Sequence, residues 1–117
     1  MRHGLADYHI HTRFSVDCRT DMTAACEAAL RAGLAEVAFC DHLDFGPSST
    51  PGYFRPASFF AELARARERF AGRLVVRAGL EAGEPHLFPE SAAEVVSAWP
   101  FDYVIGSAHY AAGMLPA

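Results

Sequence analysis

The chain has 117 residues, 51% of them hydrophobic and 21% charged, a composition that predicts one folded domain and excludes a mainly disordered chain. Acidic residues outnumber basic ones 14 to 10, and the net charge of -4 without a basic block excludes the usual electrostatic footprint of a nucleic-acid-binding protein. No apolar run is long enough to span a bilayer or form a signal peptide, so we expect a soluble protein with no membrane partner. The three cysteines form no CxxC pair, so we expect reduced thiols and a cytoplasmic location.

Four β-rich runs alternate with three stretches of helical periodicity along the chain. The runs are LADYHIH (5–11), AEVAFCDH (35–42), LVVRAGLE (74–81) and FDYVIGSAH (101–109). Strands that alternate with helices are typical of βα units on a parallel sheet. The sequence therefore predicts an α/β fold with the element order β-α-β-α-β-α-β.

The first two helical stretches carry start and stop signals. The first helix is expected to begin with Thr20 or Asp21 as its cap and to stop at Gly33. In the second, Ser58 is expected to be the cap and Gly72 to end the helix.

The third helix is expected to run from about Pro89 to Trp99, because proline is favoured in a first turn and Pro100 blocks continuation. The segment 43–56 before the second helix is rich in Gly, Pro and Ser. We expect it to be a surface loop close to any functional site.

Two histidines stand one residue apart in the first strand. Alternate side chains of an extended strand share a face, so His9 and His11 should project together while Tyr8 and Ile10 face the covering helices. The pair could converge on one metal ion. Two strand histidines can also be hydrogen-bonded core or surface residues, so the pair alone does not decide between these interpretations.

The other three strands also end in a potential metal ligand, namely His42, Glu81 and His109. The carboxyl ends of parallel strands gather at one face, so these side chains should surround a common space with the histidine pair. A strand-end glutamate paired with an arginine is the alternative for Glu81. Imidazole and carboxylate ligands suit Zn, Mn or Fe, and the lack of paired thiolates argues against a closed structural zinc site.

The segments DYHIHTRFSVD, CDH, GLE and GSAH, in this order at the strand ends, resemble the polymerase and histidinol phosphatase (PHP) family. Within it, HTRFSVD and GLEAGEPH are most similar to the histidinol-phosphatase branch. The resemblance implies the first part of a distorted seven-stranded, TIM-like βα barrel. It also implies a metal-dependent phosphoesterase that hydrolyses a small phosphate monoester such as histidinol phosphate.

The resemblance further implies a cluster of up to three divalent metal ions that activates water. The histidine pair would bind one ion, Glu81 would bridge two and His109 would hold the second, so that these residues form the catalytic centre. Asp17 and His42 would hold the third ion, although Asp17 could also be a solvated loop or cap residue. The implied metal ligands are His9, His11, Asp17, His42, Glu81 and His109.

Several neighbouring residues have weaker expectations. Arg13 could bind substrate phosphate, or it could face solvent. Glu84 and His86 should lie at the mouth of the site, where they could contact substrate, support a ligand or be plain loop residues. Asp41 points away from His42 on an ideal strand and is expected to have an orienting or capping role, and Cys40 is expected to be a small buried hydrophobic residue.

The family resemblance covers the whole chain, residues 1–117, but only about the first half of a family domain, so we expect a truncated domain. The resemblance implies that a complete family domain continues with a later Asp-x-His pair, so we expect this chain alone to have less activity than a complete domain. Four strands also leave open edges through which the chain is expected to self-associate. The alternative functions are a non-catalytic metal-binding fragment and another metallohydrolase, such as an amidohydrolase. The chain contains no lysine that could be the carboxylated lysine of an amidohydrolase, and this counts against the second alternative.

Overall fold

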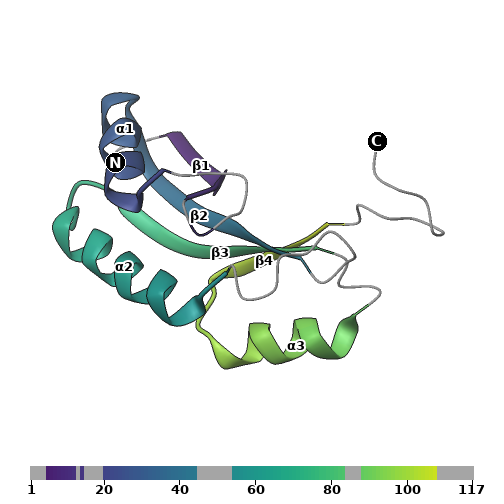
Figure 1. Cartoon of the computed structure of the whole chain (residues 1–117). Coiled ribbons are helices and arrows are strands. Elements are labelled where there is room, and N and C mark those ends of the chain that lie inside the picture. Colours follow the sequence, from purple (N-terminus) through teal and green to yellow (C-terminus); the bar gives the residue numbers. More distant parts are fainter. Residues whose placement is uncertain (1–4, 13, 15–19, 45–53, 84–87, 108–117) are drawn as a thin grey trace.

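The computed structural model describes residues 5–12, 14, 20–44, 54–83 and 88–107 (Figure 1). These residues form a parallel sheet with the strand order β1-β2-β3-β4, so each strand lies beside the next one in sequence. The predicted alternation of strands and helices is confirmed. The elements are β1 (Leu5–Ile10), α1 (Met22–Arg31), β2 (Leu34–Asp44), α2 (Pro56–Arg69), β3 (Val75–Gly83), α3 (Pro89–Ala98) and β4 (Tyr103–Ser107).

The hydrophobic core lies between one face of the sheet and the helices α1 and α2. Apolar residues recur at helical spacing in both helices and at every second position in β2 and β3, so each element turns one apolar side to the core. Helix α3 lies along the same side of the sheet as α2 (Figure 1), and its Ala92 is buried. The main core residues are Met22, Cys26, Val37, Phe39, Phe59, Leu63, Val76 and Leu80.

The ends of the helices follow most of the sequence signals. Asp21 is the N-cap residue of α1, and Gly33 adopts a left-handed conformation, with a φ of 83°, just after its end. The prediction that Ser58 caps α2 is wrong. The helix begins at Pro56, because the fixed φ of proline suits the first helical position, and Arg55 occupies the N-cap.

The second helix also ends earlier than predicted. Its last residue is Arg69, and Gly72, with a φ of 80°, lies in the turn that leads to β3. For the third helix, Pro89 and Trp99 mark the two ends as predicted, with Trp99 as the C-cap. The loop predicted at 43–56 is described only at its two ends, where β2 extends through Asp44 and α2 starts.

A bulge in β1 changes the alternation that the sequence predicted. Asp7 pairs with Val37 and Ile10 with Phe39, so two residues of β1, Tyr8 and His9, lie opposite one residue of β2. The extra residue puts Tyr8 on the face away from the helices, where its hydroxyl donates a hydrogen bond to Glu36. The expectation that Tyr8 faces the helices is therefore wrong, whereas Ile10 packs against the core as expected.

The face of the sheet opposite the helices carries the polar residues. In register across this face, Cys40, Gly79 and Tyr103 form one row, and His42, Glu81 and Ile105 form the next row toward the carboxyl ends of the strands. We call the first of these the tyrosine row and the second the ligand row. Among the described residues, the helices are too short or too polar to cross a membrane.

Candidate metal centre

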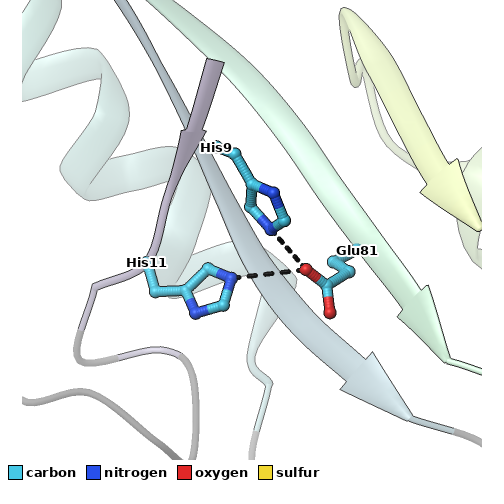
Figure 2. Close-up of side chains that lie close together, drawn as sticks. All are labelled: His9, His11 and Glu81. Atoms are coloured by element: carbon cyan, nitrogen blue, oxygen red, sulfur yellow. Dashed lines mark hydrogen bonds and ion pairs between the residues drawn. The ribbon is translucent and has the colours of Figure 1, made fainter. Parts of the chain in front are cut away.

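The candidate centre lies on the ligand row at the carboxyl ends of β1, β2 and β3. Glu81 on β3 pairs in register with His42 on β2, so the two side chains leave the sheet on the same face. His9 reaches this face from the bulge of β1, and His11 reaches it from the position just after the strand ends (Figure 2). Three chain segments that are far apart in sequence therefore meet at one carboxylate.

Glu81 is buried, and its two oxygens contact different histidines. Its Oε1 contacts Nε2 of His9 and lies 3.4 Å from Nε2 of His11 (Figure 2). Its Oε2 lies 2.7 Å from Nδ1 of His42. A buried carboxylate needs compensating partners, and here imidazole rings supply them.

The donor set fits a transition-metal ion. One ligand atom from each of His9, His11 and Glu81 lies within 4.8 Å of the other two. Ligands about 2.0–2.1 Å from a tetrahedral zinc ion are separated by about 3.3 Å. The 3.4 Å between His11 Nε2 and Glu81 Oε1 is close to this spacing, whereas His9 Nε2 lies closer to Glu81 Oε1 and would have to move apart from it to admit an ion. Two imidazoles and a carboxylate are also the chemistry that zinc, manganese or iron prefers over calcium or magnesium.

The histidine rings are packed on one another around this carboxylate. The ring centroids of His9 and His11 are 5.0 Å apart, and those of His11 and His42 are 4.3 Å apart. His9 is half exposed, whereas Glu81 is buried beneath it. The centre is therefore open toward solvent on the side of β1, where a small substrate could approach.

The tyrosine row lies beside the ligand row on the same face of the sheet, two residues closer to the amino ends of the strands. The ring of Tyr103 covers Gly79, where the Cβ of any larger residue would lie 2.7 Å from the ring carbon Cζ. Burial raises the pKa of the Tyr103 hydroxyl and raises the pKa of Cys40 to about 12. Cys40 is fully buried, as expected for a small hydrophobic residue, and the free thiol stays protonated near neutral pH.

A second polar cluster occupies the same face near the amino ends of the strands. A cavity of about 450 Å³ is lined by Tyr8, Glu36, Arg77, Asp102 and Tyr103. Arg77 donates a hydrogen bond of 3.1 Å to Glu36, and Asp102 forms an ion pair of 3.2 Å with Arg67. The hydrogen bond from Tyr8 lowers the pKa of Glu36. Each charged residue of this cluster has an oppositely charged partner: Glu36 pairs with Arg77, and Asp102 pairs with Arg67 of α2.

Thr12 was not identified from the sequence, although it follows His11 directly. It is fully buried, and its backbone N–H and hydroxyl both donate to Asp41, at 2.5 Å and 2.7 Å. Asp41 is also fully buried and points to the helix side of the sheet, as the alternation predicted. The contact joins residues 29 positions apart, and the sequence around Thr12 carries no signal that identifies its partner.

The structure brings together four of the predicted site residues and does not describe the others. The rings of His9, His11 and His42 all lie against the carboxylate of Glu81. The remaining predicted residues lie outside the described part of the chain, so their places in the site are untested; they are Arg13, Asp17, Glu84, His86 and His109.

Comparison with known proteins links this geometry to a family. Residues 7–115 match the PHP domain. The chain is 30% identical over 103 residues to the histidinol-phosphatase of Lactococcus lactis, covering 88% of this chain and 38% of that protein. It is 35% identical over 112 residues to the probable histidinol-phosphatase of Deinococcus radiodurans, covering 92% of this chain and 43% of that protein.

A solved structure has the same fold over most of the chain. The crystal structure of histidinol phosphate phosphatase from Lactococcus lactis, complexed with zinc, L-histidinol and phosphate, matches with a TM-score of 0.85 and 28% sequence identity. The match covers 92% of this chain and 41% of that one. The chain thus spans about two fifths of the length of these relatives. The predicted fold, part of a TIM-like βα barrel, is confirmed by this match.

Proposed function

This chain belongs to the PHP domain family, and we propose that it carries the metal centre of a metal-dependent phosphoesterase of the histidinol-phosphatase type. The observation that carries the proposal is the position of Glu81, with one oxygen at His9 and His11 and the other at His42. A carboxylate with ligand atoms on both sides supports a role as a bridge between two ions.

Bound divalent ions would supply two things that phosphoester hydrolysis needs: compensation of the negative phosphate oxygens and a water molecule with a lowered pKa. The chain's own residues set the conditions for this. Neutral imidazoles add no negative charge to an ion, so its attraction for phosphate is preserved, whereas an all-carboxylate set would cancel it. The half-exposed His9 leaves this centre open to a substrate.

Roles are also proposed for the residues that the structure does not describe. By resemblance to the family, His109 and Asp17 would complete the second and third ion positions. Arg13 would bind the substrate phosphate, since a guanidinium can form two parallel hydrogen bonds with it. Glu84 and His86 would contact the substrate at the mouth of the site.

The names of the relatives supply the more specific part of the proposal. Histidinol phosphate is the proposed substrate, because both sequence relatives are named for its hydrolysis and the solved relative holds L-histidinol and phosphate. Zinc is the first metal to test, since that relative holds it, and manganese and iron are the alternatives. A cytoplasmic location is proposed from the sequence alone.

The test begins with metal binding. Purified chain should retain zinc in elemental analysis, and the double variant His9→Ala/His11→Ala should lose most of it because two of the converging ligands are gone. His3→Ala, which removes a histidine that has no proposed role, is the matched control. A double variant that binds as much zinc as the parent would refute the proposed centre.

Turnover is the second step of the test. With added zinc or manganese, the chain should release phosphate from histidinol phosphate, and Glu81→Gln should abolish the release because the bridging charge is lost. Zinc binding without any release of phosphate would show that this chain is a metal-binding unit and not a hydrolase by itself.

A further inference from the structure

A pair of buried polar residues lies behind the metal centre, on the helix side of the sheet. Asp41 and Thr12 are each fully buried. The carboxylate of Asp41 accepts two hydrogen bonds from Thr12, one from its backbone N–H at 2.5 Å and one from its hydroxyl at 2.7 Å. These two hydrogen bonds join one carboxyl group to both the backbone and the side chain of Thr12, so they fix the position of this residue.

The connection joins the two segments that carry His11 and His42. Thr12 follows His11 in sequence, and Asp41 precedes His42. The two histidine rings are on the opposite side of the sheet, with centroids 4.3 Å apart. Side chains of neighbouring strand residues point to opposite faces, so a contact between Asp41 and Thr12 fixes the backbones without occupying the space of the ligands.

Ordinary strand pairing does not hold His11 in place. The last pairing between β1 and β2 joins Ile10 to Phe39, and β1 ends there. Asp41 lies two residues beyond Phe39, so its bonds to Thr12 extend the connection between the segments past the end of the ladder. The Thr12 hydroxyl also accepts a 3.4 Å hydrogen bond from the N–H of Phe14, a fully buried core residue. Thr12 is thereby joined both to Asp41 of β2 and to the buried Phe14.

We propose that Asp41 and Thr12 form a clamp that positions His11 against His42 and Glu81, and that Asp41 is therefore a positioning residue for metal binding. This inference rests on the proposed function, because it assigns a purpose to the clamp only if the histidines bind metal. Groups that hydrogen-bond directly to metal-binding histidines commonly change metal affinity by about 10-fold to 100-fold when they are removed. Asp41 acts on His11 through the backbone of Thr12, so we expect an effect at the lower end of this range.

The test uses a disruptive and a conservative substitution at each residue of the clamp. Asp41→Ala removes both acceptors and should weaken zinc binding about 10-fold or more. Asp41→Asn keeps an acceptor for the Thr12 N–H and should recover most of the affinity. Thr12→Val removes the hydroxyl and should weaken binding, whereas Thr12→Ser should not. If Asp41→Ala does not fold, the Val and Ser variants of Thr12 decide the question.

A control separates positioning from a general loss of stability. Cys26→Ala creates a cavity in the core at a fully buried position on α1, so it should lower the melting temperature and leave zinc affinity unchanged. The visible spectrum of bound Co²⁺ gives a second reading, because it changes when the ligand geometry changes. Zinc affinities of Asp41→Ala and Thr12→Val within about threefold of the parent would overturn the proposal, as would an equal loss in Cys26→Ala.

A measurement on the metal-free chain keeps this inference distinct from the proposed function. The Thr12 amide should exchange slowly with solvent in the parent and fast in Asp41→Ala, because Asp41 is its acceptor. A parent chain that binds no zinc would refute the proposed function, even if the amide is protected. Fast exchange in the parent would refute the clamp itself, whatever the zinc affinity.

Discussion

Substitution of Gly79 by alanine should destabilise the chain, because the tyrosine row leaves no space for a methyl group. A Cβ at this position would lie 2.7 Å from Cζ, 2.9 Å from the hydroxyl oxygen and 3.0 Å from Cε1 of Tyr103. The ring must therefore move, and overpacking of this kind costs about 1–3 kcal/mol. Replacing a strand glycine by alanine returns about 0.5–1 kcal/mol of backbone entropy.

The middle of these two ranges gives a net loss of about 1.2 kcal/mol. Unfolding entropy is about 2.1 cal/mol/K per residue, which for 117 residues gives about 0.25 kcal/mol/K, so each kcal/mol lowers the melting temperature by about 4 °C. The expected decrease is about 5 °C by calorimetry. In the double variant Gly79→Ala/Tyr103→Leu the two losses should be less than additive, because the ring that collides is gone. An unchanged or higher melting temperature in Gly79→Ala would show that Tyr103 does not fill this space.

Three further predictions concern other parts of the chain. Burial raises the pKa of Cys26 to about 11 and that of Cys40 to about 12, so both thiols should react slowly with alkylating reagents at pH 8 and quickly in denaturant. Peptide mass spectrometry measures both rates, and rapid reaction of the native thiols would contradict their burial. The hydrogen bond from Tyr8 lowers the pKa of Glu36, so its stabilising contribution is present at neutral pH and is lost as the pH falls through the pKa of the folded state. Tyr8→Phe should therefore reduce the loss of stability on acidification, and identical acid unfolding curves would refute this. On the outermost strands, Leu5 of β1 exposes 69% of its surface and Val104 of β4 exposes 36%, so the chain should self-associate through these edges. The double variant Leu5→Lys/Val104→Lys should favour the monomer in analytical sedimentation, and a monomeric parent would contradict the prediction.

Periodicity was sufficient to predict the order of the elements and the ends of the strands at which ligands gather. The reason is that parallel βα units constrain where successive strand ends lie, so His42 and Glu81 could be placed together from sequence alone. The prediction that Tyr8 faces the helices failed because one extra residue in β1 reverses the alternation of side chains between the two faces of the sheet. The bulge at Tyr8 and His9 leaves no mark in the hydrophobic pattern, because it depends on how β1 pairs with β2.

Local signals also competed at the start of α2. Ser58 is a good capping residue, but Pro56 is two residues earlier, and proline at the first helical position determines where the helix begins. The contact between Thr12 and Asp41 could not be predicted for a different reason. It joins residues 29 positions apart, and a threonine after a strand gives no indication of which buried acceptor it will meet.

The tripeptide Cys40-Asp41-His42 explains why β2 is central to the site. Because strand side chains alternate, Cys40 enters the tyrosine row, Asp41 reaches the helix side and His42 enters the ligand row. Cys40 thus packs next to the metal centre, Asp41 connects β2 to Thr12 on the helix side, and His42 is a candidate ligand. A shift of β2 by one residue would put the aspartate on the ligand side and both the thiol and the imidazole in the core. The long pairing of β2 with β3, from Glu36 to Asp44, opposes such a shift, so the register of this strand pair is what keeps His42 beside Glu81.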